Sequence, residues 1–167
     1  LLWEKATGQP VYFDFHDMAQ DDYGAIKASC CVPVVNRPYR WRGKAYYDGG
    51  LSDPIPFQQA FQAGCDRVVV ILTRPKDYYR DPKKDQRMAK FLRKYPNAAR
   101  VLALRAETYN RQLEQAHALA QAGKVLLVAP DDIGGMSTLT KDRGAILTMY
   151  HKGRSDAKAI GAFLAGK

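Results

Sequence analysis

The residues best suited to chemistry lie in residues 46–56, which read Tyr-Tyr-Asp-Gly-Gly-Leu-Ser-Asp-Pro-Ile-Pro. Asp48 follows an apolar stretch, and Gly49 and Gly50 come directly after it. A carboxylate at the end of a strand can act as a general acid or base, and glycine lets other backbone approach closely because it has no Cβ atom. Asp-Gly is also a common hairpin turn, so a purely structural role is the competing interpretation.

An aspartate that acts as a base needs a nucleophile beside it, and two serine-containing segments come close to the Gly-x-Ser-x-Gly elbow. Residues 135–139 end in leucine, whose bulk opposes a tight elbow. We expect a helix cap there, from Ser137, Thr138 or Thr140. Residues 153–157 end in a small alanine, but Gly153 is typical of a helix stop and Ser155 of the next cap. The sequence therefore offers no nucleophilic elbow and no glycine-rich oxyanion loop.

Histidine does not supply a second catalytic or metal site. His16, His117 and His151 are scattered along the chain, without clustered partners. His16 lies between Asp14 and Asp17, a grouping that a surface turn explains better than a metal site. We expect no metal and no other cofactor.

The cysteines indicate a reducing environment. Cys30, Cys31 and Cys65 are odd in number and lack metal-ligand spacing, and the adjacent pair cannot form an unstrained disulfide. We expect reduced thiols packed as small apolar groups, and hence a cytoplasmic protein.

The charge favours anionic partners. The 167 residues carry 26 Lys and Arg against 17 Asp and Glu, a net charge of +9. Phospholipid head groups and nucleic acid both fit such a charge. Zinc-finger spacing, an RNA-recognition signature and a separate basic tail are all missing, so we expect no nucleic acid partner.

A basic amphipathic helix is predicted within residues 74–111. Its basic residues recur at helical spacing among Met88, Phe91 and Leu92; they are Lys83, Lys84, Arg87, Lys90, Arg93 and Lys94. One interpretation is a solvated outer face whose apolar stripe packs on the domain. The other is peripheral contact with an anionic membrane surface.

The elements that must position Asp48 follow from the apolar pattern. We expect strands at 41–47, 67–73 and 124–130, the last two buried on both faces because they are continuously apolar. We expect helices at 20–31, 57–63, 85–95, 98–122, 140–152 and 155–165. The long helix presents one broad apolar side, formed by Val101, Leu104, Tyr109, Leu113, Ala116 and Ala120. This order predicts an α/β fold, with a mostly parallel sheet covered by helices on both faces.

The chain reads as one domain, 1–167, or a piece of one. It is 46% apolar, with no linker-like division and no apolar run long enough for a bilayer span. Residues 6–13 read as a turn between two strands, so the chain opens inside a hairpin. We expect that part of the protein precedes Leu1.

Residues 23–73 resemble the patatin-like phospholipase family, bacterial type. The likeness rests on Ala28-Ser29-Cys30 before Val32-Pro33, on residues 42–51 with Asp48-Gly49-Gly50, on Pro54-Ile55-Pro56, and on residues 63–70. These pieces fall in the family's order and spacing. The resemblance implies the C-terminal part of a three-layer α/β sandwich with a mostly parallel sheet.

The resemblance also implies a reaction. The family hydrolyses lipid acyl esters with a Ser-Asp dyad and no histidine, and Asp48 matches its catalytic aspartate, followed by Gly49 and Gly50. Asp48 would take the proton from a serine that attacks a phospholipid or other lipid ester. Because the family's serine precedes its aspartate, we expect the serine elbow in a missing N-terminal half. This chain alone should therefore be inactive.

Two other functions stay open. A binding or regulatory α/β module could keep the fold without chemistry. A nucleotide-binding domain is suggested by residues 129–135, where Gly134-Gly135 follows a predicted strand, but this loop lacks the Gly-x-Gly-x-x-Gly spacing and the P-loop lysine. Acyl-chain specificity, head-group specificity and oligomeric state do not follow from the sequence.

Overall fold

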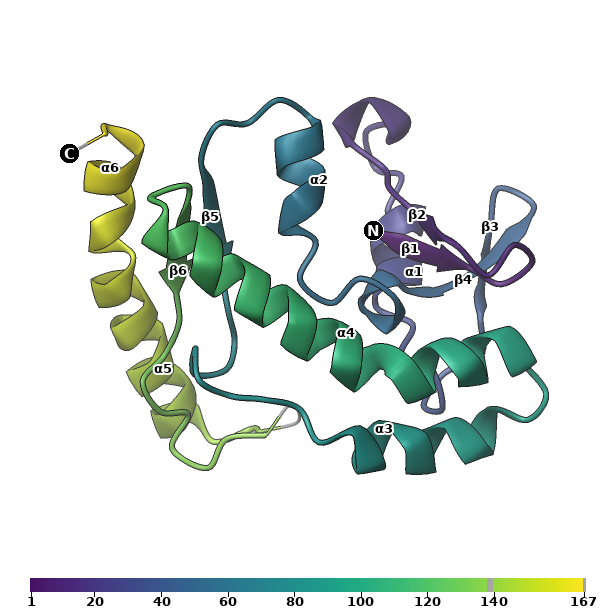
Figure 1. The fold of residues 1–167 in the computed structure, drawn as a ribbon. Helices are drawn as coiled ribbons and strands as arrows, with labels where there is room; N and C mark the ends of the chain where they lie inside the picture. The colour runs from purple at the N-terminus through teal and green to yellow at the C-terminus, as the bar shows by residue number, and fades with distance from the viewer. Residues whose placement is uncertain (138–139, 167) are drawn as a thin grey trace. The chain divides into compact units, whose positions relative to one another are not determined.

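The fold is that of a computed structural model, which describes residues 1–137 and 140–166 (Figure 1). The chain divides into two compact units. Unit 1 contains Leu1–Ile55 and Tyr79–Arg111, and unit 2 contains Pro56–Tyr78 and the segment from Gln112 to the C-terminal end. The predicted mixed α/β class is confirmed, since both units combine helices with strands.

Unit 1 is built on a four-stranded antiparallel sheet of order β2-β1-β4-β3. Its strands are β1 (Leu2–Glu4), β2 (Pro10–Val11), β3 (Tyr39–Trp41) and β4 (Lys44–Asp48). The short helices of this part are η1 (Phe15–Asp17), α1 (Gly24–Ser29) and η2 (Gly49–Leu51). The predicted hairpin at the start of the chain is confirmed as the antiparallel pair β1 and β2.

The prediction of one strand over residues 41–47 is wrong, because a tight turn divides the segment. Arg42 and Gly43 both have positive φ, 47° and 75°, and the strands on either side pair as Trp41 with Lys44. Two central residues with positive φ define the type I′ turn, whose twist matches an antiparallel hairpin. Arg42-Gly43 therefore reverses the chain and leaves β4 as the strand that ends at Asp48.

The core of unit 1 packs the sheet against helices that come later in the chain. These are α3 (Pro82–Ala89), η3 (Lys90–Leu92) and α4 (Pro96–Gln121), the last contributing its residues up to Arg111. One buried cluster joins the sheet to these helices: Trp3, Tyr47, Leu51, Ala89, Leu92, Ala98 and Leu102. A second cluster, Leu2, Ala28 and Tyr46, fixes α1 against the sheet.

Local capping explains where these helices begin. Asp81 accepts a hydrogen bond of 2.9 Å from the Lys83 N–H, and Pro82 occupies the first helical turn of α3. Pro96 likewise begins α4 and so does separate the two helices, as the sequence predicts. The predicted apolar side of α4 is wrong at Leu104, which is 49% exposed, because the buried row follows Ala98, Leu102 and Ala106 instead.

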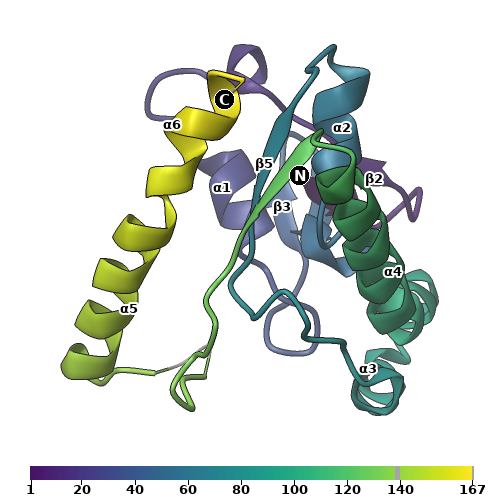
Figure 2. The same cartoon turned by 60° about the vertical axis from the view of Figure 1, so that its left-hand side comes forward.

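Unit 2 is built around two parallel strands, β5 (Val68–Ile71) and β6 (Val125–Val128), which lie side by side (Figures 1 and 2). Its helices are α2 (Phe57–Gln62), α5 (Arg143–Asp156), α6 (Lys158–Leu164) and α4 from Gln112 onward. The prediction of a mostly parallel sheet is not confirmed, because the larger sheet is antiparallel. Short turns join β1 to β2 and β3 to β4, and strands joined in this way must run in opposite directions.

The prediction that both apolar strands of unit 2 are buried on both faces is wrong for β5. Ile71 is 70% exposed, and Val68 and Val69 are only half-buried. In β6, Val125 and Val128 are buried. A continuous apolar run therefore marks a strand here without fixing how much of it is covered.

The C-terminal helices differ from their predicted bounds. Asp142 caps α5, since its Oδ1 accepts a hydrogen bond of 2.7 Å from the Ala145 N–H, in place of the predicted hydroxyl caps. Thr138 lies outside the described residues. Gly153, predicted as a helix stop, lies inside α5. Within residues 1–137 and 140–166, no helix is long and apolar enough to cross a membrane.

Candidate active site

Asp48 is the last residue of β4, as the sequence predicts, and both its neighbours in the sheet and its own backbone fix its position. It lies opposite Leu2 of β1 in antiparallel register. Its N–H donates a hydrogen bond of 2.9 Å to the carbonyl oxygen of Cys31, just beyond α1. The side chain is half-buried. Asp48 is therefore held by two segments that are far from it in sequence.

The carboxylate of Asp48 has one oxygen engaged. Oδ1 accepts a hydrogen bond of 2.8 Å from the Gly50 N–H, which caps the short helix η2. No other hydrogen bond from a described residue reaches this carboxylate, and no described hydroxyl group donates to it. A half-buried carboxylate held by one oxygen can accept a proton at the other, which is the arrangement a general base requires.

The glycines after Asp48 have different neighbours. A Cβ atom on Gly49 would lie 2.7 Å from the backbone carbonyl carbon and oxygen of Leu1, so glycine is required for this close approach. A Cβ atom on Gly50 would lie 3.3 Å from Oδ1 of Asp48. Gly49 thus makes room for Leu1, just before β1, and Gly50 makes room for the carboxylate of Asp48.

The two motif segments of the sequence meet at the start of β1. The Ser29 hydroxyl donates a hydrogen bond of 3.2 Å to the carbonyl oxygen of Leu1, the residue that packs on Gly49. Ala28, beside Ser29, is fully buried with Leu2. Residues 28–30 and 48–50 are therefore parts of one packed arrangement. Because the Ser29 hydroxyl is hydrogen-bonded to backbone, Ser29 is not placed as a nucleophile.

Cys31 is a neighbour of Asp48 that sequence reasoning did not single out. Burial raises the pKa of the Cys31 thiol, the thiol of Cys30 and the carboxylate of Asp48 raise it further, and a hydrogen bond from the Tyr39 backbone lowers it. A raised pKa keeps this thiol neutral and poorly nucleophilic. Cys31 therefore places an uncharged side chain near Asp48. Only the fold could reveal this, since 17 positions separate the two residues.

A second contact missed by sequence reasoning ties the Asp48 turn to β2. The Tyr12 hydroxyl donates a hydrogen bond of 2.5 Å to Oδ2 of Asp53, across 41 positions of sequence. The N–H groups of Ser52 and Asp53 both donate to the Gly49 carbonyl oxygen at 3.0 Å. No local sequence pattern predicts the hydrogen bond between Tyr12 and Asp53, although Asp53 belongs to the segment 46–56 that contains Asp48.

The two near-elbow serines are not in elbows. Ser155 lies within α5, where it is exposed. The Ser137 N–H donates a hydrogen bond of 2.8 Å to Oγ1 of Thr140, and Thr138 and Leu139 of that segment lie outside the described residues. Neither serine follows a strand-to-helix turn of the kind that exposes a nucleophile.

The cysteines and histidines form no further centre in the described part of the chain. The three cysteines are free, but the expectation that they are packed is wrong for Cys30 and Cys65, which are exposed. The His117 ring lies 2.7 Å from the Lys76 carbonyl oxygen, as expected for a satisfied residue. Among residues 1–137 and 140–166, no group of three or more His, Cys, Asp or Glu side chains could hold a metal ion.

The Gly134-Gly135 loop has its own internal contact. Asp132 Oδ1 accepts a hydrogen bond of 3.1 Å from the Gly134 N–H. A phosphate-binding loop needs such N–H groups free to face the ligand, and a carboxylate next to them repels phosphate. This geometry does not favour nucleotide binding.

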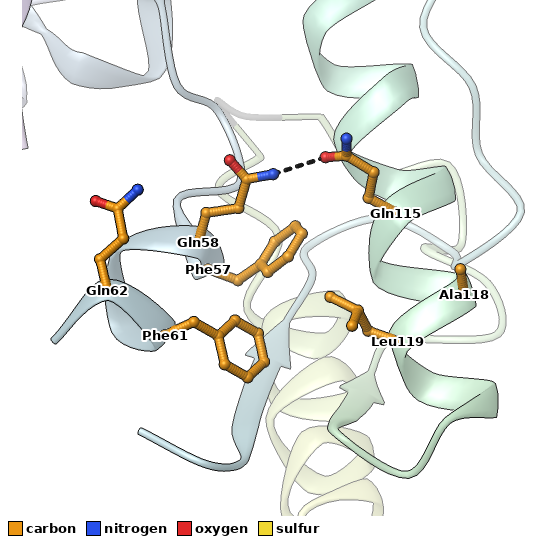
Figure 3. Close-up of a pocket in the computed structure, with 7 residues that line it drawn as sticks. All are labelled: Phe57, Gln58, Phe61, Gln62, Gln115, Ala118 and Leu119. Carbon is orange, nitrogen blue, oxygen red and sulfur yellow. Dashed lines mark hydrogen bonds between the residues drawn. The ribbon is translucent and has the colours of Figure 1, made fainter. Parts of the chain in front are cut away.

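A hollow of about 470 Å³ lies between α2 and α4 in unit 2 (Figure 3). Phe57, Phe61 and Leu119 supply apolar surface, and Gln58 donates a hydrogen bond of 2.8 Å to Gln115 at its edge. The residues that line it are all uncharged. Because it has no titratable group, this hollow offers no catalytic chemistry of its own.

Comparison with known proteins gives the Asp48 region a family context. Residues 9–61 match the patatin-like phospholipase family. The matched range takes in α1, β3, β4 and the Asp48 turn. The match covers 53 of the 167 residues, so the activity of that family is a matter of proposal for this chain.

A second family model matches residues 95–162 and is described as a domain of unknown function, DUF6363. The chain is also similar to the Uncharacterized protein YjjU of Escherichia coli (strain K12), with 38% identity over 68 residues. That match covers 40% of this chain and 19% of the relative. The chain therefore spans less than a fifth of that protein's length, and any activity of a whole protein is a matter of proposal.

Proposed function

We propose that this chain carries the aspartate side of a lipid acyl hydrolase site, a phospholipase or esterase that uses a Ser-Asp dyad. Asp48 is the general base. The single observation that carries the proposal is its carboxylate, which is half-buried at the end of β4 with Oδ1 held by Gly50 and within the segment that matches patatin-like phospholipases.

The chemistry follows from the environment of Asp48. A free aspartate, with a pKa of about 3.9, is a weak base, so a general base of this kind needs a direct hydrogen bond to the serine that it activates. The serine oxygen attacks the ester carbonyl and its proton passes to Asp48. Asp48 then passes this proton to the alcohol or head group, which leaves, and the acyl group stays on the serine. Water hydrolyses this acyl-serine and releases the fatty acid.

The nucleophile and the oxyanion loop lie outside this chain in this proposal. Ser29 is engaged with Leu1, and Ser155 lies within a helix. The chain is the C-terminal part of a patatin-like domain whose N-terminal half brings the serine elbow. By itself it does not turn over substrate.

The test compares the longer protein, expressed with the coding sequence upstream of Leu1, with two of its variants. Hydrolysis of a medium-chain nitrophenyl ester is measured for each. Asp48→Asn keeps an acceptor for the Gly50 N–H but cannot take a proton, so kcat should fall by about a thousandfold. Asp53→Asn, in the same turn, keeps an acceptor for Tyr12 and should retain full activity.

Three outcomes contradict the proposal. Full activity in Asp48→Asn would exclude Asp48 as the base. Failure of a labelled fluorophosphonate to react with the longer protein would favour a binding or regulatory module without chemistry. Labelling of the 167-residue chain by itself would instead show that a serine of this chain is the nucleophile.

Peripheral contact with an anionic membrane through the basic helix belongs to the same proposal. Along α3, η3 and the turn after them, four exposed residues recur at spacings of three and four: Lys84, Arg87, Phe91 and Lys94. Phe91 is 78% exposed, whereas its neighbour Leu92 is buried. One aromatic ring within a row of cations suits the boundary between head groups and acyl chains. The exposed basic row with Phe91, next to the buried Leu92, supports this part of the proposal.

A further inference from the structure

The outer face of α5 presents an apolar patch that unit 2 covers only in part. Leu147 and Tyr150 lie one turn apart and are 45% and 54% exposed, and Ile146 beside them is 46% exposed. Arg143 and Arg154 extend the same row at both ends, at spacings of four residues, and are exposed. No residue of α5 is fully buried. The row Arg143–Leu147–Tyr150–Arg154, with Ile146, is called the α5 stripe below.

The polar contacts that attach α5 and α6 to unit 2 come from residues outside the α5 stripe. Lys152, on another side of the helix, forms ion pairs with Asp131 at 2.7 Å and with Asp156 at 3.2 Å. The following helix α6, which continues from α5 (Figure 2), is attached by a hydrogen bond of 2.6 Å from Arg67 to the Phe163 carbonyl oxygen. These contacts hold the helix pair through residues outside the stripe.

The electrostatic character of the α5 stripe is positive. The acidic residues at the two ends of the helix are engaged, Asp142 in the cap of Ala145 and Asp156 with Lys152. Arg154 lies over the ring of Tyr150, with its guanidinium carbon 5.9 Å from the ring centre. The face is therefore an apolar centre with a cation at each end, about 16 Å apart along the helix at 1.5 Å per residue.

We propose that the α5 stripe is a membrane-binding surface that takes anionic phospholipid. Ile146, Leu147 and Tyr150 enter the boundary between head groups and acyl chains. Arg143 and Arg154 extend along the surface to lipid phosphates, as long basic side chains do at interfaces. A second copy of this chain fits less well, because a twofold contact would bring the arginines of both copies together.

This surface is separate from the basic row on α3 and rests on the proposed function only for its lipid context. Binding can be measured without hydrolysis. If the unaltered longer protein cleaves a soluble nitrophenyl ester but does not bind vesicles, this inference alone is overturned. An inactive longer protein that binds vesicles would leave it in place.

The experiment is co-sedimentation of the 167-residue chain with vesicles of phosphatidylcholine, with and without 30% phosphatidylglycerol as a probe of anionic lipid. Reversing both charges in Arg143→Glu/Arg154→Glu should lower the partition coefficient of the chain on anionic vesicles by about tenfold or more. The reason is that each basic residue near an anionic surface adds its own contribution to the binding free energy. The matched control Arg111→Glu/Lys124→Glu makes the same change in net charge at two exposed positions outside the stripe. It should bind nearly as well as the original chain.

A second variant tests the apolar part. Leu147→Ser/Tyr150→Ser should weaken binding to the same vesicles by about tenfold while leaving the far-UV circular dichroism of the helices unchanged. Equal losses in the stripe and control variants would show that only net charge matters, and would overturn the proposal. So would the absence of binding to anionic vesicles, or a concentration-dependent dimer that the Leu147→Ser/Tyr150→Ser variant abolishes.

Discussion

The two units bury their apolar residues to different extents. In unit 1 the sheet places Trp3 and Tyr47, 0% and 1% exposed, in one cluster with the helices. In unit 2, Ile71 of β5 is 70% exposed, and Leu147 and Tyr150 of α5 are 45% and 54% exposed. In unit 1 two hairpins join through β1 and β4 into a four-stranded sheet, whereas two parallel strands form only a small sheet that exposes its flanks. The difference teaches that apolar composition predicts burial only where enough strands come together.

The largest effect on the free energy of unfolding is expected from a buried ion pair in unit 1. Asp85 of α3 is 3% exposed and accepts two hydrogen bonds from Arg105, at 2.6 and 3.1 Å. Arg105→Ala should lower the free energy of unfolding by about 4 kcal/mol, because it leaves a buried carboxylate without its closest cation. Urea unfolding followed by far-UV circular dichroism measures this loss.

The matched change in unit 2 is Lys152→Ala, which removes the partner of Asp131. Asp131 is 88% exposed on its side chain, and the pair of Lys152 with Asp156 is an i,i+4 helix pair, which contributes little to stability, so the urea midpoint should move far less than in Arg105→Ala. A comparable loss of stability in both variants would break the contrast between the units.

A smaller effect is expected from apolar truncation. Leu102, in the core cluster of unit 1, is 1% exposed, and Leu102→Ala should cost about 3 kcal/mol of unfolding free energy. Ile71→Ala, in unit 2, should change it by less than about 0.5 kcal/mol, because the side chain is already in water. Similar costs for the two substitutions would show that Ile71 is covered in solution.

The smallest effect is a dependence on pH at the alkaline end. Burial raises the pKa of Tyr47 to about 12, and the nearby Tyr95 and Cys31 add to the shift. The folded state therefore favours the neutral phenol. The resulting stability is fully present below the unfolded pKa of about 10 and is lost as the pH rises toward 12. Urea unfolding between pH 8 and 11.5 should show this decline, and Tyr47→Phe should reduce it. Identical pH profiles for both proteins would contradict the assignment to Tyr47.

Much of this arrangement could be predicted from local sequence. Asp48 does end a strand, and Pro96 does begin a helix, because both depend on residues close in sequence. Type I′ geometry at Arg42-Gly43 escaped prediction, since a turn with arginine in its first central position lacks the usual Asn-Gly or Asp-Gly signal.

The parts of the site that could not be predicted depend on distant residues. Leu1 packs on Gly49, and Tyr12 binds Asp53, through contacts that only the folded sheet creates. The role of Asp48 as a base stays a prediction, because it depends on a serine that this chain does not place beside it. The resemblance to patatin-like phospholipases supplied the hypothesis, and the sheet supplied the geometry around the aspartate.

The positions of the two tryptophans have a practical consequence. Trp3 and Trp41 are the only tryptophans of the chain, and both belong to unit 1, in β1 and β3. Intrinsic fluorescence excited at the indole band therefore reports on unit 1 alone. Trp3 lies opposite Tyr47, the residue before Asp48. In a Trp41→Phe variant, quenching of the Trp3 emission by acrylamide would therefore give an optical readout of whether β1 stays paired with β4, the strand that ends at Asp48.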